Sequence, residues 1–600
     1  MLRRSLLKGA AALPLTFGLA APLAAMAAPP RRRVRPGDPG WPDAGQWAAL
    51  GAAVGGRLVK VASPLAECAE APDSPACAEL FKNLRNPFFI NESPALTQTL
   101  GWVDAWTSHA SEYAVAAETS ADVAAAVTFA RKHRLRLVVK GGGHSYLGGS
   151  NAPDSLLIWT KPMRAIQLHD SFTPQGCAGR VAATPAASIG AGAIWLEAYD
   201  AVTTKAGRYV QGGGCTTVGV AGLVQGGGFG SYSKGFGTGA ANLLEAEVVT
   251  ADGVVRIANA CTNPDLFWAL KGGGGGTFGV VTRLTLRTHD LPATFGGVNA
   301  KITATSDAAY RALVEQVLTF YRTSLFNPHW GEQIGFRNKR QVTIDMVLQG
   351  LDHAEAEKTW APLFDWLAAR PADYSFSKPS IQTLPARLFW NPAILKTVPG
   401  VVKGDDRPGA PASHFIWSGD AGQVGQVLHG YQSTWLSQRL LDPDRLPALV
   451  DALVHAAATW GVSLHCNKGL AGAPPEALAR TRETATNPAV LDAFCLAISG
   501  AGEGPAYPGV AGHEPNVERG RIEAKLMRAA MAPLMALPSR PASYISETDY
   551  FEPDWQAAFW GEHYARLQAV KRRYDPEGLF FVHHSVGSEG WSPDGFAKLG

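Results

Sequence analysis

The sequence predicts an α+β protein with more than one domain. Its 600 residues exceed what a single hydrophobic core usually serves, and a hydrophobic content of 46% is enough for large cores. Between residues 181 and 286, short β-rich segments alternate with glycine loops, without the regular strand–helix repeat of a doubly wound fold. After about residue 292 the glycine runs end, and amphipathic helices alternate with strands. This change of pattern predicts a second domain.

The charge balance argues against one class of partner. The formal net charge is only +3, and no stripe of Lys and Arg runs along the chain. Proteins that bind nucleic acid usually gather basic residues on one face or along one helix. We therefore expect no nucleic-acid partner.

The first 27 residues have the pattern of an export signal. Arg3 and Arg4 precede a weakly apolar Ala/Leu segment, and residues 25–27 form a small-residue cleavage site. The segment resembles a bacterial twin-arginine signal. An uncleaved membrane anchor is the alternative, but two prolines and modest hydrophobicity argue against it. We expect transport by the twin-arginine machinery, a mature protein without a stable membrane span, and a location in the periplasm or outside the cell.

The seven cysteines suit an oxidising compartment, where disulfides persist. Cys68 and Cys77 are near enough in sequence to pair around a Pro-containing loop. Two further pairs would complete three bridges, Cys177 with Cys261 and Cys466 with Cys495, although the sequence leaves these pairings open. Cys215 would then be the sulfur left for another role. A zinc site is disfavoured, because no C-x-x-C motif or tight Cys/His cluster is present.

The elements of the first half follow in order. Residues 28–108 form a Pro-, Gly- and Arg-rich linker and an N-terminal extension with the Cys68/Cys77 loop. Ser120 is placed to cap a helix whose apolar positions share one face, namely Val123, Ala126, Val127 and Ala130. A buried strand is predicted at 135–139, and it runs into a glycine loop that carries a histidine, Gly141-Gly142-Gly143-His144-Ser145.

The second half has longer elements. The periodicity predicts a helix within 306–324, a strand at 341–350 and a helix at 353–369. The segment 541–600 contains a further helix and a turn at Tyr574-Asp575-Pro576.

The glycine clusters do not fit an ordinary dinucleotide-binding loop. Gly274, Gly276 and Gly279 match the G-x-G-x-x-G spacing, but the β-branched residues that follow indicate a strand and not the required helix. We therefore expect a different cradle, in which backbone N–H groups from several loops bind a pyrophosphate.

Two longer motifs carry a specific resemblance. VVKGGGHSYLGGS and GGGCTTVGVAGLVQGGGFG resemble the flavin-attachment loops of the berberine bridge enzyme-like flavoproteins, in the vanillyl-alcohol oxidase / p-cresol methylhydroxylase superfamily. DLFWALKGGGGGTFGVVTRLTL and YDPEGLFF resemble that family's next FAD-contacting segment and its C-terminal turn. The resemblance implies a two-part FAD-binding domain of the p-cresol methylhydroxylase type at 109–291. It also implies a substrate domain at 292–540, with an antiparallel sheet covered by helices, and a segment 541–600 that returns to the FAD domain.

The resemblance also implies a covalently bound FAD. In this family a histidine at the position of His144 bonds the flavin 8α-methyl carbon, and a cysteine at the position of Cys215 bonds ring carbon C6. Both residues are present, so we predict double attachment, with attachment through His144 alone as the alternative. Glycines let the backbone approach the flat ring. No metal is expected, and the further predicted FAD contacts are Gly141, Gly142, Gly143, Ser145, Gly214, Val218, Gly219, Gly222, Gly227, Gly228, Gly279 and Val280.

The catalytic base is expected near the C-terminus. Flavin N5 takes a hydride, so a base must remove the hydroxyl proton of the same substrate. The family pattern Tyr-x-Asn-Tyr-x-Asp appears here with Ser and Glu at its third and fourth positions, which leaves Tyr544 or Glu547 as the base. Tyr146 matches another active-site tyrosine of the family. Lys468 is a candidate cation beside the base, and a solvated surface lysine is the alternative.

The leading functional prediction is an exported FAD-linked oxidase or dehydrogenase that oxidises an alcohol-type C–H of a small molecule, with sugars or oligosaccharides as the first substrate class. One alternative is oxidative cyclisation or desaturation of an aromatic or alkaloid-like metabolite. Another is a flavin electron-transfer protein without a substrate of its own. Oxygen is the expected electron acceptor, with a quinone or cytochrome as the alternative.

Overall fold

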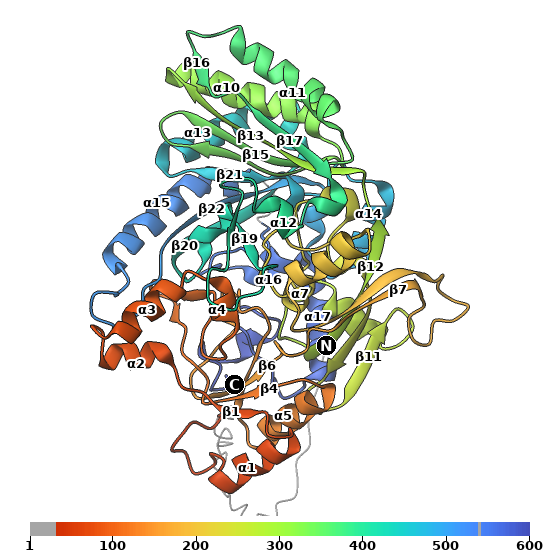
Figure 1. Cartoon of the computed structure of the whole chain (residues 1–600), viewed down its shortest axis with the longest axis vertical. Helices are drawn as coiled ribbons and strands as arrows, with labels where there is room; N and C mark the ends of the chain where they lie inside the picture. Colours follow the sequence, from red (N-terminus) through yellow and green to blue (C-terminus); the bar gives the residue numbers. More distant parts are fainter. Residues whose placement is uncertain (1–31, 538–541, 600) are drawn as a thin grey trace, which may run out of the picture.

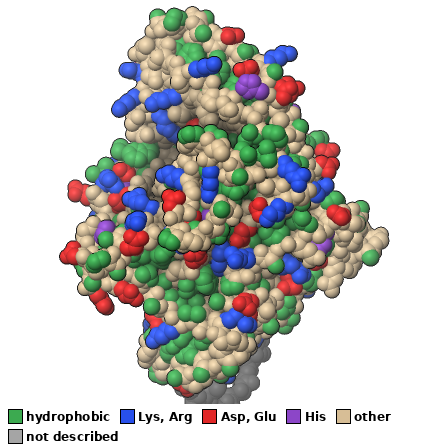
Figure 2. Space-filling view, viewed as in Figure 1, with side chains coloured by type: hydrophobic (Ala, Val, Ile, Leu, Met, Phe, Trp, Pro, Cys, Tyr) green, Lys and Arg blue, Asp and Glu red, His purple; other side chains and the backbone are tan. Residues whose placement is uncertain are grey.

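The computed structural model of the chain describes residues 32–537 and 542–599 (Figure 1). The predicted export signal lies outside these residues. Two smaller sheets and the surrounding loops form the lower part of the molecule in Figure 1, and one large sheet with long helices forms the upper part. Within the described ranges, no helix is both long enough and apolar enough to cross a membrane. Figure 2 shows acidic and basic side chains interspersed over one face.

The first small sheet contains the predicted helix–strand–glycine-loop unit. Its order is β1-β4-β6-β5, with bounds Leu58–Lys60, Tyr113–Ala116, Ser155–Trp159 and Arg136–Lys140. Helix α5, Ser120–Lys132, packs on it through the four predicted apolar positions, all of which are buried. The predicted cap is wrong by one residue. The hydroxyl of Thr119 accepts from the backbone N–H of Asp122, whereas the Ser120 hydroxyl donates to Glu247.

The second small sheet is antiparallel. Its order is β11-β10-β12-β8-β7, and β9 pairs with the far end of β12. The bounds are Ile166–Phe172 for β7, Thr184–Gly190 for β8, Arg208–Val210 for β9, Leu243–Val249 for β10, Val255–Asn259 for β11 and Val280–Asp290 for β12. Residues from this sheet join the largest buried core cluster, which also takes in parts of the glycine loops.

The large sheet of ten strands carries the second half of the chain. Its order is β16-β13-β15-β14-β21-β22-β20-β2-β3, with β17 beside β13. Neighbours are antiparallel except that β2 runs parallel to β20. The strands are β2 Thr99–Trp102, β3 Trp106–Thr107, β13 Thr294–Ala304, β14 Trp330–Arg337, β15 Gln341–Gln349, β16 Tyr374–Phe376, β17 Ser380–Pro385, β20 Gln426–Ser437, β21 Val462–His465 and β22 Ala493–Glu503.

Long amphipathic helices cover this sheet, as the sequence predicts. They are α10 Asp307–Phe320, α11 His353–Ala368, α13 Leu446–Thr459 and α15 Val517–Met535 (Figure 1). Their apolar faces and the sheet share one core cluster. The predicted helices at 306–324 and 353–369 and the strand at 341–350 are confirmed, because their periodicity matches one buried face. The mixed helices and sheets are those of the predicted α+β fold.

The C-terminal segment returns to the small sheets. Helix α17, Tyr564–Tyr574, ends at Asp575, whose carboxylate accepts the backbone N–H groups of Leu579 and Phe580 at 2.7 and 2.9 Å. Lys571 donates to the same carboxylate at 2.7 Å. This network fixes the Tyr-Asp-Pro turn, and Phe580 then forms a parallel bridge with Leu137 of β5.

Two of the three suggested disulfides are present. Cys68 pairs with Cys77, and Cys177 pairs with Cys261. The third pairing is absent: Cys466 and Cys495 are both buried free thiols. Strand β21 ends at His465, opposite Leu496 of β22, so Cys466 falls in the 3-10 turn that follows and not in the ladder opposite Cys495.

Candidate functional site

Two glycine loops from different sheets meet at the centre of the site. Gly141–Gly143 follows β5, and the loop that begins at Gly212 follows β9. A Cβ built on Gly142 would lie 2.6 Å from the backbone nitrogen of Gly219, and one on Gly219 would lie 2.8 Å from that of Gly142. Such distances leave no room for a side chain in either loop. The loops therefore bring their backbones into direct contact.

This contact places the two predicted attachment residues in adjoining loops. His144 Nε2 lies 3.2 Å from Thr217 Oγ1, and Thr217 is two residues after Cys215. Burial lowers the pKa of His144 to about 4, which keeps the imidazole neutral at physiological pH. Burial raises the pKa of the Cys215 thiol, and the neighbouring Asp420 carboxylate adds to this effect.

An open space lies beside these loops. Gly222, in the short helix α7 (Val220–Gln225), is exposed, and a Cβ built on it would meet no atom within 4 Å. A Cβ on Gly275, from a third glycine loop, would be in van der Waals contact with Gln225 and Gly222, at 3.9 Å. Among the described residues, the buried Oε1 of Gln225 has no hydrogen-bond partner. The open face of Gly222, with an unpartnered polar atom beside it, fits a flat cofactor with polar edges such as FAD.

The remaining predicted contact residues fall into three groups. Ser145, Gly214 and Val218 are half-buried and belong to the two loops that carry His144 and Cys215. Gly227 and Gly228 have left-handed backbones, with φ of 114° and 79°. Gly279 and the buried Val280 lie at the start of β12, where a Cβ on Gly279 would come within 2.7 Å of the carbonyl oxygen of Val249. These last two are thus also packing residues of the second sheet.

The two base candidates face different partners. Lys468 Nζ donates to Glu547 Oε1 at 2.6 Å, and the lysine is 9% exposed, so it is not the solvated surface residue of the alternative interpretation. Burial raises the pKa of Tyr544, and the charge of Glu547 raises it further. Its ring meets Phe229 edge-on at 4.9 Å. Glu547 is the candidate that stays paired with a cation.

Tyr146 lies near Glu547. Its hydroxyl donates to Gln423 Oε1 at 3.1 Å, and its ring centroid is 5.3 Å from that of Tyr431. Burial raises the pKa of both tyrosines, and the charge of Glu547 raises each further. Two neutral phenols therefore stand around one carboxylate, where they can donate hydrogen bonds to a polar substrate.

Two carboxylates at this site were missed in the sequence. Glu332 of β14 has a left-handed backbone, with φ of 61°, which is rare outside glycine and marks functional sites. Its Oε1 accepts a hydrogen bond from Ser231, and burial raises its pKa. Asp420 lies beside Cys215, and burial raises its pKa to about 6. Its buried Oδ2 has no hydrogen-bond partner in the part of the chain that the structure describes. Neither residue belongs to a recognisable motif, so no local signal was available.

Other aromatic residues and histidines support the fold. Trp417 Nε1 donates to the carbonyl of Gly214 at 3.1 Å, which anchors the Cys215 loop. His583 and His584 stack on each other at 3.8 Å, and His583 also stacks on Tyr550. Over the described residues, no group of three or more His, Cys, Asp or Glu side chains is arranged to hold a metal ion.

Sequence comparison relates the chain to known FAD-linked proteins. The sequence profile of an FAD binding domain matches residues 111–259, and a profile described as berberine and berberine like matches residues 543–587. FAD-linked oxidoreductase easE of Trichophyton verrucosum is 30% identical over 94% of this chain and 91% of its own. VAO-type flavoprotein oxidase VAO615 of Thermothelomyces thermophilus is 29% identical over 95% of each chain.

Solved structures of flavoproteins share the fold of this chain. The crystal structure of VAO-type flavoprotein MtVAO615 from Myceliophthora thermophila has a TM-score of 0.75 at 25% identity, over 95% of this chain and 100% of that chain. Glucooligosaccharide oxidase from Acremonium strictum, described with a 6-S-cysteinyl, 8α-N1-histidyl FAD, shares the fold with a TM-score of 0.59 at 19% identity, over 88% and 99% of the two chains. The protein is thus an FAD-dependent oxidoreductase that belongs to the berberine bridge enzyme-like family of the vanillyl-alcohol oxidase / p-cresol methylhydroxylase superfamily.

Proposed function

We propose that the flavin is attached at both His144 and Cys215 and that the enzyme oxidises a small hydroxylated molecule. The observation that carries the proposal is the contact of the two glycine loops, which brings His144 to within 3.2 Å of Thr217 and hence near Cys215. Glucooligosaccharide oxidase, described with this double linkage, is a precedent for the chemistry on the same fold. A neutral imidazole with a free nitrogen is the form that can bond to carbon.

Glu547 is the proposed base. FAD, when bound, supplies the acceptor for a hydride from the substrate carbon. Glu547 removes the substrate hydroxyl proton, and Lys468 holds its carboxylate in one orientation at 2.6 Å. Tyr146 and Tyr431 donate hydrogen bonds to the substrate. Tyr544 does not move the proton, because burial and the charge of Glu547 raise its pKa and keep the phenol neutral.

The preferred substrate class is a sugar, oligosaccharide or other polyol. Carboxylates and phenols in one small region offer several hydrogen bonds to neighbouring hydroxyl groups. Carbohydrate oxidase from Microdochium nivale and chitooligosaccharide oxidase share the fold, at 20% and 18% identity. This likeness supports the scaffold, while the substrate rests on the polar lining.

One observation favours a second substrate class. Glu332, Asp420 and Glu547 are three carboxylates near Cys215, with Lys468 as their neighbouring cation. An excess of negative groups would attract a protonated amine. Oxidative cyclisation or desaturation of an alkaloid-like amine is therefore the second candidate.

We further propose that the protein is exported through the twin-arginine machinery and uses oxygen as its electron acceptor. The disulfides Cys68–Cys77 and Cys177–Cys261 support an oxidising compartment. Covalent attachment would suit such a compartment, because lost FAD is not replaced there. Peroxide formed in stoichiometric amounts during turnover would identify oxygen as the acceptor, and cell fractionation would test the location.

Acid denaturation tests the central proposal. The purified protein is precipitated in acid, and the yellow colour should remain with the pellet. Cys215→Ala and His144→Ala should each retain colour through the other bond, and the double variant should release it. Release from the parent protein would overturn the attachment. A panel of sugars, polyols and amines, followed anaerobically by flavin bleaching, would then decide between the two substrate classes.

A further inference from the structure

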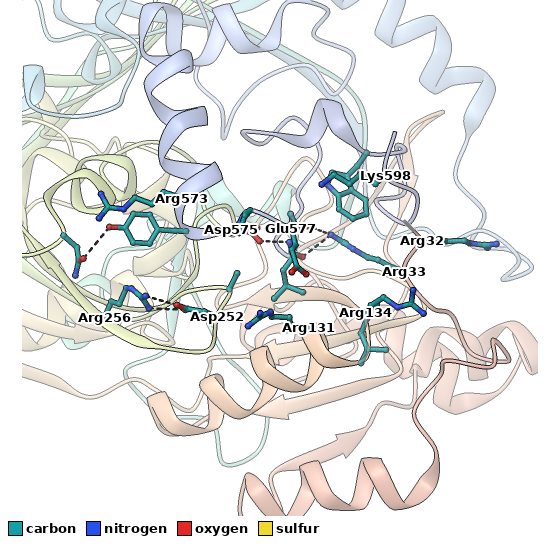
Figure 3. A pocket seen from close by; sticks show the side chains of 18 residues that line it. Arg32, Arg33, Arg131, Arg134, Asp252, Arg256, Arg573, Asp575, Glu577 and Lys598 are labelled. Atoms are coloured by element: carbon teal, nitrogen blue, oxygen red, sulfur yellow. Dashed lines mark hydrogen bonds and ion pairs between the residues drawn. The ribbon is translucent and has the colours of Figure 1, made fainter. Parts of the chain in front are cut away.

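A cavity lies away from the two glycine loops that carry His144 and Cys215. It has a volume of about 510 Å³ and opens between the end of α5, the β10–β11 turn, the C-terminal Tyr-Asp-Pro turn and residues near both chain ends (Figure 3). Leu135, in its wall, precedes β5, whereas the Gly141–Gly143 loop follows the same strand. The five residues of β5 span roughly 17 Å. The cavity and the Gly141–Gly143 loop are thus at opposite ends of β5.

The lining of this cavity is strongly basic. Figure 3 shows that its charged side chains come from segments that are far apart in the sequence. Three acids line it, and the cations are more than twice as numerous: Arg32, Arg33, Arg131, Arg134, Arg256, Arg573 and Lys598, against Asp252, Asp575 and Glu577. This ratio contrasts with the near-neutral balance of the whole protein.

Two of the three acids are already engaged. Asp252 pairs with Arg256 at 2.7 Å. Asp575 accepts from Lys571 and from two backbone N–H groups of its own turn. Within the described ranges, five of the lining cations form no ion pair, whereas Arg256 and Arg573 pair with Asp252 and Asp265; the five are Arg32, Arg33, Arg131, Arg134 and Lys598. A net positive charge therefore remains for a ligand.

Arg33 provides an independent indication of a missing partner. Its side chain is 4% exposed and lies 4.1 Å over the ring of Trp591. Nη2 donates to the carbonyls of Gly578 and Leu579 at 2.6 and 3.1 Å, but the buried Nη1 has no hydrogen-bond partner among residues 32–537 and 542–599. Burial lowers the pKa of Arg33 to about 10, which still leaves it protonated at neutral pH. A buried donor without an acceptor costs free energy, which an anion would recover.

We propose that this cavity binds a small anion with an apolar body, such as an aromatic phosphate, sulfate or carboxylate. The anionic group would accept hydrogen bonds from the unpaired guanidinium groups of Arg131 and Arg134 and from Nη1 of Arg33. A guanidinium group can bind two oxygens of such a group at once. The apolar body would lie on Leu135, Ala251 and Leu579. The volume is in the range of small-molecule sites. Nothing in this proposal depends on the substrate of the flavin site.

Isothermal titration of the flavin-containing protein with three probes tests the proposal. 1-Naphthyl phosphate carries both features, inorganic phosphate carries the charge alone, and 1-naphthalenemethanol carries the apolar body alone. We expect 1-naphthyl phosphate to bind at least tenfold more tightly than either of the others. Equal binding of inorganic phosphate would overturn the apolar part of the proposal, and absence of binding by 1-naphthyl phosphate would overturn all of it.

Matched variants locate the binding. Arg131→Gln combined with Arg134→Gln should weaken 1-naphthyl phosphate at least tenfold. Lys132→Gln is the control, because Lys132 is exposed on the same helix but does not line the cavity. Unchanged flavin absorbance and thermal midpoint would show that both variants fold. If binding were equal in the two variants, or fell equally in both, the cavity would not be the site.

Discussion

Lys468 and Glu547 form an ion pair inside the site, with Nζ 2.6 Å from Oε1 and side chains that are 11% and 22% exposed. The pair joins the 3-10 turn after β21 to the C-terminal segment, so residues 79 positions apart in sequence define one functional unit. The contact with Lys468 holds the Glu547 carboxylate in one orientation. Four predictions concern this unit and its surroundings, and one concerns the cysteines.

Glu547→Gln should lower the rate of flavin reduction by about 10²- to 10⁴-fold, the usual contribution of a general base. The flavin content should not change, because Glu547 lies outside the two glycine loops. Anaerobic stopped-flow bleaching measures this step directly. Tyr544→Phe is the matched variant and should retain most of the rate. The opposite result, a large loss in Tyr544→Phe alone, would assign the base to Tyr544.

Lys468→Met should lower the rate of flavin reduction by about 10²-fold, because the Glu547 carboxylate would lose the 2.6 Å contact that orients it, and a misplaced reacting group costs rate on this order. Anaerobic stopped-flow bleaching measures this rate, and Lys468→Arg should restore most of it, since it keeps a cationic donor. An unchanged rate in Lys468→Met would mean that Lys468 serves only to pack the site.

Asp420→Asn should stabilise the protein at pH 7.5 but not at pH 4. The pKa of Asp420 is raised to about 6, so between about pH 4 and 6 the folded state holds a proton that the unfolded chain releases. Stability therefore falls as the pH rises through this window, by up to about 3 kcal/mol. Thermal midpoints at both pH values measure the difference. Asp406→Asn, at an exposed position of the same region, should show no such dependence.

Two glycine variants should separate folding from flavin binding. Gly222→Ala removes a helical glycine where the new methyl meets no atom within 4 Å, so the fold should gain up to about 1 kcal/mol. The same methyl enters the proposed flavin space, so the flavin content should fall. Gly142→Ala should instead fail to fold properly, because its Cβ would press on the backbone of Gly219. Full flavin content in Gly222→Ala, measured by the ratio of visible to ultraviolet absorbance, would place the flavin elsewhere.

Thiol counting gives a test that does not depend on activity. Cys215, Cys466 and Cys495 are the cysteines outside the two disulfides. In denaturant without a reducing agent, a thiol reagent should modify two cysteines if Cys215 is bonded to the flavin. The Cys215→Ala variant should also give two. Three reactive thiols in the parent protein would mean that Cys215 is free, and none or one would mean that Cys466 and Cys495 are paired.

The fold and the FAD-linked family were predictable because their signals are local. The glycine loops, the helix before β5 and the Tyr-Asp-Pro turn each depend on a few neighbouring residues, and the long helices follow from their periodicity. The cap of α5 was misplaced because Thr119 and Ser120 are both able to cap, and only the structure shows that the Ser120 hydroxyl bonds to Glu247. Such choices depend on tertiary neighbours.

The acidic part of the site was not predictable for the same reason. Glu332 lies on a strand and Asp420 in a short 3-10 segment, and neither has a motif around it. Glycine and asparagine are the residues usually found at a positive φ. A glutamate at position 332 therefore gives no indication in the sequence of this backbone conformation. The suggested disulfide between Cys466 and Cys495 was wrong, because sequence spacing does not show where the pairing of β21 with β22 ends.

The parallel pairing of β2 with β20 has a consequence for how the chain is made. Residues near position 100 leave the ribosome long before the strand at 426–437 that they must join. The bridge between Leu137 and Phe580 likewise forms only after residue 580 has been made. The nascent chain must therefore carry unpaired strand edges until these later segments have emerged. The second half, expressed by itself, would lack β2 and β3 at one edge of its large sheet.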